Sequence, residues 1–180
     1  MSSLEYERLH HNLRLLDLIT LDSILDNYLE IAAKDGKSTI EILDYLVAQE
    51  VENKESRSCA LRMRLAGFPV EKRLEDFDFK FQPALDKATI KDLASMRFIH
   101  NHENIVFLGP PGVGKTHLAI ALGIESIKSG FRVNFVNASN LVEKLSKAEK
   151  EKRLEEMIRK LSKFQVLIID EIGYMPFDEM

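Results

Sequence analysis

The sequence predicts an α/β fold in which helices flank a parallel sheet, preceded by a small all-α domain. Two short apolar runs favour buried strands: residues 105–108 lead into a glycine-rich loop, and residues 166–169 lead into two carboxylates. Residues 4–65 instead repeat apolar side chains at spacings of three and four, which is typical of helices. We therefore expect a helical domain at 1–69, a linker at 70–82 and the domain that holds the sheet at 83–180.

The sequence of the helical domain contains signals for the N-termini of two helices. Within the apolar repeat of its first 34 residues, Thr20 or Asp22 is the expected N-cap of a second helix. Ser38, with Glu41 three residues later, forms the pattern of a capping box. This box is expected to open the long helix that ends the domain.

A turn at residues 67–69 is expected to end that helix and begin the linker. Phe77, Phe79 and Phe81 alternate with charged residues, so an extended conformation would place the three rings on one face, against the core. Contact between one ring and an adenine base is the less favoured interpretation. Residues 83–102 are expected to form a helix that opens the second domain.

The stretch from Gly109 to Thr116 reads GPPGVGKT and fits G-x-x-x-x-G-K-[ST], the phosphate-binding P-loop. It lies between a predicted strand at 104–108 and a predicted helix at 115–129, the arrangement in which the motif is meaningful. The glycines let the main chain approach phosphate closely, Lys115 reaches the β- and γ-phosphates, and the Thr116 hydroxyl is a ligand for Mg²⁺. The predicted nucleotide-binding residues are Gly109, Pro110, Pro111, Gly112, Val113, Gly114, Lys115, Thr116 and His117.

Two carboxylates form the second candidate site, because Asp170 and Glu171 follow the apolar run at 166–169. At the C-terminal end of a buried strand they would face the ligand crevice of an open α/β sheet. Asp170 is predicted to hold Mg²⁺ together with Thr116, and Glu171 to act as the general base for the water that attacks the γ-phosphate. A strand at 131–137 and a charged helical stretch at 140–163 are expected between the two motifs.

The three predicted strands are too few for a nucleotide-binding sheet of this kind. In ATPases with a glutamate after this aspartate, another strand lies between the P-loop strand and the aspartate strand, and no segment of the sequence supplies it. Without it, two buried strands would leave backbone N–H and C=O groups unpaired. We therefore expect the sequence to be a fragment, or a shortened product, of a protein that continues for another strand–helix–strand unit or more.

The net charge of −4 is unevenly distributed. Residues 1–53 carry 11 acidic and 4 basic side chains, whereas residues 54–73 carry 6 basic and 2 acidic ones. Lys54, Arg57 and Arg64 would flank one apolar stripe of the long helix. Their spacing alone favours a solvated edge over a ridge that contacts nucleic-acid phosphates.

The composition of the chain indicates the cellular compartment in which the protein works. The single cysteine, Cys59, fits a reducing cytoplasm and excludes an intramolecular disulfide framework. No apolar run is long enough to span a membrane, and the N-terminus lacks a signal-peptide pattern. We expect a cytoplasmic protein without a membrane partner.

Several of these motifs resemble the IstB/DnaC-like helper ATPases. The helices before residue 70, with residues 55–57 and 65–69, resemble the IstB branch of transposition helpers more than the helicase-loader branch. The resemblance covers essentially the whole chain. It is carried by Phe77-Asp78-Phe79, the string GPPGVGKTHLA from Gly109, the string GFRVNFV from Gly130, and the string LIIDEIGY from Leu167 to Tyr174.

The resemblance implies an AAA+ ATPase of a bacterial insertion sequence. Such proteins assemble with ATP and Mg²⁺ as oligomers on double-stranded DNA, bend it, and stimulate a partner transposase. The resemblance places a sensor residue, and an arginine that acts on a neighbouring subunit's γ-phosphate, in the part that this sequence lacks. ATP hydrolysis is therefore expected of the full-length family rather than of this chain alone. DNA contact by the helical domain is also implied, through Lys54, Arg57, Arg62 and Arg64.

Three other functions stay open on the sequence alone. A nucleotide-gated DNA-binding module, such as a helicase loader in replication, would use the same residues without turnover. A GTPase is suggested because residues 170–173 also read D-x-x-G, but no guanine-reading N-K-x-D motif occurs. A small-molecule kinase would need an arginine-rich lid, and none is visible.

Overall fold

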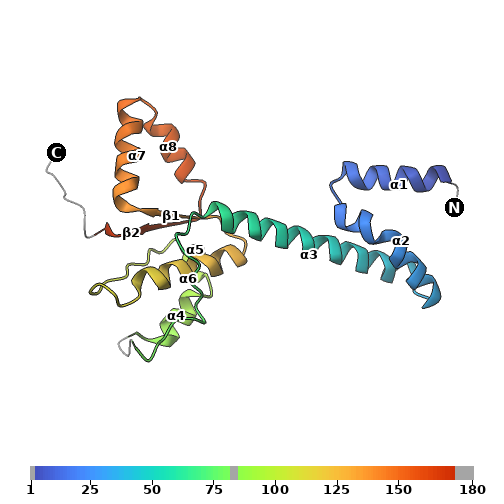
Figure 1. Cartoon of the computed structure of the whole chain (residues 1–180), viewed down its shortest axis with the longest axis horizontal. Coiled ribbons are helices and arrows are strands. Elements are labelled where there is room, and N and C mark those ends of the chain that lie inside the picture. Colours follow the sequence, from blue (N-terminus) through green and yellow to red (C-terminus); the bar gives the residue numbers. More distant parts are fainter. Residues whose placement is uncertain (1–2, 82–84, 173–180) are drawn as a thin grey trace. The chain divides into compact units, whose positions relative to one another are not determined.

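The computed structural model describes residues 3–81 and 85–172. The chain divides into two compact units, Met1–Ser58 and Cys59–Met180, and the boundary falls inside the helix α3 (Thr39–Leu65). Figure 1 shows helices alone in the first unit, and helices with a short sheet in the second. The predicted α/β class, with a parallel sheet and a helical N-terminal part, is confirmed.

The first unit is built from α1 (Ser3–Leu15), α2 (Ile19–Lys34) and most of α3. Its buried core takes one leucine from each helix: Leu13, Leu25 and Leu46. All three belong to the apolar repeats that predicted helices here. Their burial provides the tertiary packing that stabilises helices of this length in water.

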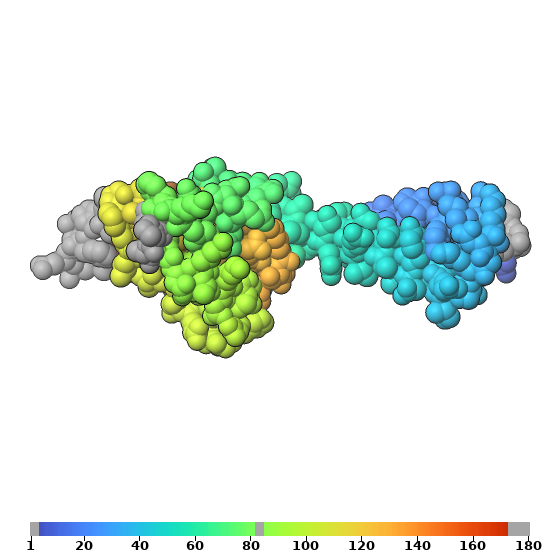
Figure 2. All heavy atoms as spheres, turned by 90° about the horizontal axis from the view of Figure 1, so that it is seen from below, coloured from blue at the N-terminus to red at the C-terminus, as the bar shows by residue number. Residues whose placement is uncertain are grey.

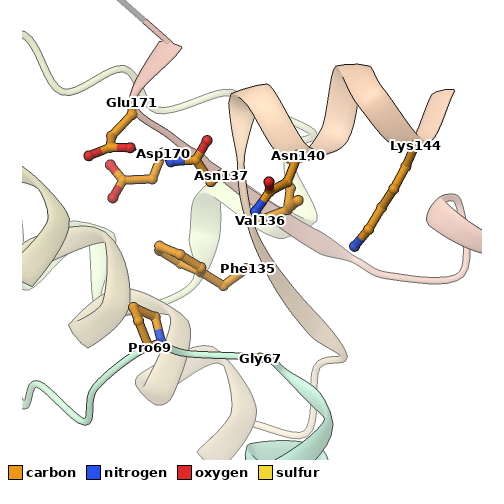
Figure 3. Close-up of a pocket in the computed structure, with 9 residues that line it drawn as sticks. All are labelled: Gly67, Pro69, Phe135, Val136, Asn137, Asn140, Lys144, Asp170 and Glu171. Atoms are coloured by element: carbon orange, nitrogen blue, oxygen red, sulfur yellow. Dashed lines mark hydrogen bonds between the residues drawn. The ribbon is translucent and has the colours of Figure 1, made fainter. Parts of the chain in front are cut away.

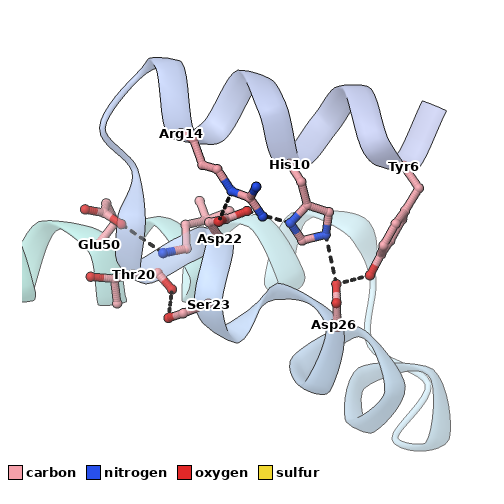
Figure 4. Close-up of polar contacts among 9 residues, drawn as sticks. Tyr6, His10, Arg14, Thr20, Asp22, Ser23, Asp26 and Glu50 are labelled. Atoms are coloured by element: carbon pink, nitrogen blue, oxygen red, sulfur yellow. Dashed lines mark hydrogen bonds and ion pairs between the residues drawn. The ribbon is translucent and has the colours of Figure 1, made fainter. Parts of the chain in front are cut away.

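Polar side chains join α1 to α2 across the surface of the first unit (Figure 4). His10 places one ring nitrogen against the carboxylate of Asp22 and the other 3.2 Å from Asp26, whose carboxylate also accepts a hydrogen bond from Tyr6. The Arg14 guanidinium donates to Asp22 at 2.9 Å. Hydrogen bonds from Arg14 and His10 hold the pKa of Asp22 below its usual range, so this carboxylate stays charged at neutral pH.

The start of α2 differs from the prediction. The helix is preceded by Leu18, which has no side chain able to cap it, so the predicted caps Thr20 and Asp22 are wrong. A carboxylate from a distant part of the sequence takes over this role, because Glu50 of α3 accepts a hydrogen bond from the backbone N–H of Leu21 at 2.8 Å. The first-turn donors of a helix need such acceptors, and here tertiary packing supplies one.

Both ends of α3 agree with the prediction. At the start, the Ser38 backbone N–H donates to the Glu41 carboxylate at 2.8 Å and the Glu41 N–H donates to the Ser38 hydroxyl at 3.3 Å, which completes the capping box. At the end, Gly67 adopts a φ of +74°, a conformation that favours glycine. The carbonyl of the preceding Ala66 accepts a hydrogen bond of 2.7 Å from the backbone N–H of Phe135.

The sheet of the second unit consists, within the described residues, of two parallel strands, β1 (Val133–Asn137) and β2 (Val166–Asp170). In Figure 1, α6 (Lys115–Lys128) lies on one side of the sheet, and α7 (Ala138–Lys150) with α8 (Leu154–Leu161) lies on the other. The connection from β1 to β2 through helices is the crossover that parallel strands require.

Helix α6 is the most deeply buried helix of the second unit, with Leu118, Ile120, Ile124 and Ile127 almost inaccessible to solvent. It approaches β2 closely at Gly123, where a Cβ atom would lie 2.7 Å from Cδ1 of Ile168 and 2.9 Å from Cζ of Phe68. Only glycine fits this contact without a shift of its neighbours. The close approach brings the start of α6 near the end of β2.

The predicted strand at residues 104–108 is wrong. These residues are irregular, and Val106 and Leu108 are 74% and 88% exposed. A strand exists only where a neighbouring strand pairs with its backbone, and none of the described residues pairs with this segment. The apolar run therefore has the composition of a strand, but composition alone did not reveal whether its backbone has a strand to pair with.

The predicted helix at 83–102 is interrupted. It forms as α4 (Lys87–Leu93), capped by the Asp86 side chain, and α5 (Arg97–His100), with the buried Met96 between them at a φ of +63°. The start at Pro83 lies outside the described residues.

The charged stretch at 140–163 likewise forms two helices, α7 and α8, which meet at a turn containing Lys152 at a φ of +57°. No helix within the described ranges combines the length and the hydrophobicity that crossing a bilayer requires.

Residues 70–81 follow an irregular path with bends and turns rather than an extended one, and with α4 and α5 they make up the green surface of the second unit in Figure 2. Phe77 is buried and Phe79 is half-buried, but Phe81 is 72% exposed. The expectation that all three rings face the core is therefore wrong for Phe81, because a chain that turns does not keep alternate side chains on one face.

The buried Glu50 generates a prediction about stability. Its carboxylate accepts hydrogen bonds from Leu21 N–H and, at 3.1 Å, from the Arg57 guanidinium. Glu50→Ala removes both, so we expect a loss of about 1–3 kcal/mol in the free energy of unfolding, measured by urea denaturation followed by circular dichroism.

Glu52→Ala, an exposed change on the same helix, is the matched control and should stay within about 0.5 kcal/mol of the unchanged protein. Equal midpoints for the two variants would contradict the capping role of Glu50.

Candidate functional site

The glycine-rich loop begins the candidate site because it leads into the N-terminus of α6. Gly112 and Gly114 adopt φ values of +83° and +92°, which favour glycine, and Gly114 is the residue from which α6 starts. The first N–H groups of a helix lack intrahelical acceptors and attract anions. The backbone of this loop is therefore suited to hold phosphate groups.

Lys115 lies against the loop that precedes it. Its ammonium donates to the carbonyl oxygens of Gly109 at 2.9 Å and Pro110 at 2.8 Å. The side chain thus folds back over the loop, and its positive charge lies among the groups that would surround an anion. An ammonium is a strong point donor to phosphate oxygens.

Thr116 and Asp170 lie in contact although 54 residues separate them. The Thr116 hydroxyl is 3.0 Å from one carboxylate oxygen of Asp170 and 3.1 Å from the other. Asp170 is the last residue of β2, and the close packing of α6 on β2 at Gly123 explains why the two side chains meet. The structure therefore brings together the two residues that the sequence analysis assigned to a magnesium ion.

The oxygen donors of this pair fit Mg²⁺. A hydroxyl and a carboxylate are hard ligands of the kind that Mg²⁺ binds, and the ion usually completes its shell with water and substrate phosphates. Among the residues that the structure describes, no three His, Cys, Asp or Glu side chains gather closely enough to hold a metal by themselves. A metal at Thr116 and Asp170 would complete its shell with water or with the oxygens of a bound ligand.

Glu171 is held by a residue that the sequence analysis missed. Its backbone has a φ of +60°, and its carboxylate accepts a hydrogen bond from the side-chain amide of Asn137, which lies opposite Asp170 in the strand register. The amide oxygen of Asn137 accepts from the N–H and the hydroxyl of Ser139 at 3.0 Å and 2.6 Å, and so caps α7. The signal in the sequence was Asn137 two residues before Ser139, at the end of the strand expected at 131–137.

A cavity of about 420 Å³ opens beside these residues at the carboxyl ends of the strands. Figure 3 shows Asn137, Asp170 and Glu171 in its wall, with Asn140 and Lys144 of α7 further along. No residue of the glycine-rich loop lines this cavity. The loop is the candidate phosphate site on its own geometry, and the cavity is lined by both Asp170 and Glu171.

The side chain of His117 contacts the segment that precedes α4. A ring nitrogen lies 2.8 Å from the carbonyl oxygen of Arg73, and the ring meets that of Phe77 edge to face, with centroids 5.2 Å apart. A contribution of His117 to nucleotide binding would accordingly come from its backbone N–H in the first turn of α6.

The four basic residues proposed for DNA differ in their surroundings. Lys54 and Arg57 belong to the first unit, and Arg62 and Arg64 to the second. Lys54 and Arg64 are exposed, Arg62 is half-buried, and Arg57 forms an ion pair with the buried Glu50. Arg57 is therefore engaged within the protein, and DNA contact by these four residues stays a prediction.

Comparison with known proteins gives a consistent result. The family described as "IstB-like ATP binding protein" matches residues 11–180. The final residues of the string from Leu167 to Tyr174 lie outside the described part of the structure.

Similar proteins have names that refer to insertion sequences and to ATP binding. A protein of insertion sequence IS21 from Pseudomonas aeruginosa is 44% identical over 86% of this chain and 58% of its own length. One of IS232 from Bacillus thuringiensis subsp. berliner is 38% identical over 96% of this chain and 69% of its own length. A protein of IS5376 from Geobacillus stearothermophilus is 40% identical over 96% of this chain and 68% of its own length. The chain thus spans roughly three fifths to two thirds of the length of these relatives.

Proposed function

This chain belongs to the IstB-like ATP-binding protein family, and from this premise we propose that it binds ATP with Mg²⁺ as the helper protein of an insertion sequence. The contact between Thr116 and Asp170 carries the proposal, because it joins the end of the glycine-rich loop to the end of β2. Loop amides, a lysine, a hydroxyl and a carboxylate form the usual set of protein groups around a nucleotide triphosphate.

In the proposed complex, backbone N–H groups from Gly109 to His117 surround the phosphates, and Lys115 exchanges its loop carbonyls for phosphate oxygens. Thr116 and Asp170 hold Mg²⁺, which neutralises phosphate charge when bound. The exchange at Lys115 is favourable because a phosphate oxygen carries more negative charge than a carbonyl oxygen.

Glu171 is the proposed general base for hydrolysis. In the structure one of its carboxylate oxygens, Oε2, accepts a hydrogen bond from Asn137, and the other oxygen is the proposed acceptor of the proton from water. Asn137 is therefore proposed to orient this carboxylate for hydrolysis by the full-length protein. As an AAA+ protein, it would also require the arginine of a neighbouring subunit.

The same contact favours a second candidate function. If the hydrogen bond to Asn137 holds Glu171 away from the attacking water, ATP would act as a switch for assembly without turnover, as in a nucleotide-gated helicase loader. Release of inorganic phosphate, with and without duplex DNA, separates these two candidates.

The names of the relatives support the link to an insertion sequence and to ATP binding. The remaining parts of the proposal rest on the resemblance to transposition helpers: the protein would assemble as an oligomer on double-stranded DNA and activate the transposase of its insertion sequence, in the cytoplasm. Basic residues outnumber acidic ones at 54–73, and Lys54, Arg62 and Arg64 are the proposed contacts to DNA phosphates, with Arg57 shared with Glu50.

Lys115→Ala tests the nucleotide site. We expect ATP affinity to fall about 10- to 100-fold, because the variant loses a charged hydrogen-bond donor to the phosphates, as measured by isothermal titration calorimetry. Lys128→Ala, at the other end of the same helix, is the matched control and should bind ATP normally. Unchanged affinity in Lys115→Ala would exclude the loop as the ATP site.

Glu171→Gln tests the general base. The variant keeps the size of the side chain but cannot accept a proton, so it should bind ATP as the unchanged protein does while phosphate release by the full-length protein falls about 100-fold or more. Turnover at the normal rate would contradict the assignment. No release even from the unchanged full-length protein, with DNA present, would favour the switch.

Salt dependence tests the DNA contacts. Removing two phosphate contacts in Lys54→Ala/Arg64→Ala should weaken binding to any duplex and lower the slope of log K against log salt by about 2, as measured by fluorescence anisotropy. Lys34→Ala, an exposed change in α2, should leave the slope unchanged. Equal slopes for all three proteins would support the solvated-edge interpretation of these residues.

A further inference from the structure

The space beneath Gly114 is filled by a side chain from another part of the sequence. A Cβ atom built on Gly114 would lie 2.6 Å from Cε2 and 3.2 Å from Cζ of Phe77. The other two loop glycines lack such a neighbour, since a Cβ on Gly112 meets nothing within 4 Å and one on Gly109 meets only Val113 of the loop itself. Gly114 is thus the loop glycine that a distant residue holds in place.

Phe77 is itself firmly packed. It is 8% exposed and belongs to a buried cluster with Ile90 of α4 and Leu118 of α6. Its ring meets Phe79 edge to face at 4.9 Å between centroids. A ring fixed on several sides resists displacement, so the backbone resting on it is restrained as well.

The segment that carries Phe77 is also fastened to α6 by a polar contact. His117, in the first turn of α6, reaches the carbonyl oxygen of Arg73 at 2.8 Å, and its ring meets Phe77 at an interplanar angle of 87°. Two residues in and after the loop, Gly114 and His117, therefore contact the same short segment, which includes residues 73–77.

We propose that Phe77 is a positioning residue for the phosphate-binding loop, which acts by holding the backbone at Gly114 in the conformation that receives the triphosphate. The inference rests on the proposed ATP site. A loop with three glycines has much backbone freedom, and a ligand that must order it loses affinity. A packed ring beneath the loop removes that cost before the ligand arrives.

The proposal is distinct from contact between Phe77 and an adenine base. A positioning residue acts on the phosphates through the loop, so its loss should weaken every ligand that carries a triphosphate. A residue in contact with the base should matter for ATP alone. Inorganic tripolyphosphate, which has no base, separates the two roles.

Phe77→Leu is the central variant because it keeps an apolar side chain but lacks Cε and Cζ, the atoms that approach Gly114. We expect the affinities for ATP and for tripolyphosphate to fall together by about tenfold, within the range for residues in contact, as measured by calorimetry. Ile90→Val removes one methylene from the same cluster without contact to Gly114. It should lower the melting temperature but leave both affinities unchanged.

A second-site test uses the clash directly. Gly114→Ala should lose most binding, because its Cβ meets the Phe77 ring and its φ of +92° disfavours alanine. In Gly114→Ala/Phe77→Leu the ring atoms are absent, so binding should recover about tenfold relative to Gly114→Ala alone, although the backbone cost persists. A purely structural role for Phe77 predicts the opposite, that the double variant binds more weakly than either single one.

The outcomes separate this inference from the proposed function. If the unchanged protein binds neither ligand, the ATP site itself is wrong. If it binds both and Lys115→Ala does not, then normal binding by Phe77→Leu, or a loss confined to ATP, overturns the positioning role while the ATP site stands. The positioning role is also overturned if Gly114→Ala/Phe77→Leu loses as much binding free energy as the two single variants lose together.

Discussion

The meeting of Thr116 and Asp170 depends on how closely α6 packs against the sheet, and the rest of the candidate site depends on that meeting. At Gly123 the absence of a side chain lets α6 lie directly against the side chains of Ile168 and Phe68. The parallel register then places Asn137 opposite Asp170, so that hydroxyl, carboxylates and amide gather at one end of the sheet. One small residue in the helix interior thus contributes to the close approach that brings Thr116, two turns away, to Asp170.

Much of the site was visible in the sequence because its determinants are local. The glycines, Lys115 and Thr116 occupy adjacent positions, and an apolar run followed by an acid predicts β2 with Asp170 at its end. The capping box at Ser38 and the glycine that ends α3 are local in the same sense. In each case the residue type and its neighbours in the chain determine the backbone conformation.

The errors arose where a distant partner decides the outcome. Residues 104–108 have the composition of a strand but no described partner to pair with, α2 takes its acceptor from Glu50 of another helix, and Phe81 follows a turn that composition did not reveal. Asn137 escaped notice for a related reason. Its cap on α7 is local, but its bond to Glu171 exists only once the two strands are side by side.

The hydrogen bond from Phe135 to the carbonyl of Ala66 has an effect on the sheet as a whole. Phe135 is the middle residue of β1, and Ala66 directly follows α3. The hydrogen bond therefore uses a backbone donor at the edge of β1 that another strand would need for pairing. Exposed edge strands can pair with strands of other protein chains, and proteins often cover such edges. Among the described residues, the hydrogen bond to Ala66 thus occupies a donor on the β1 edge, which a further strand would otherwise use.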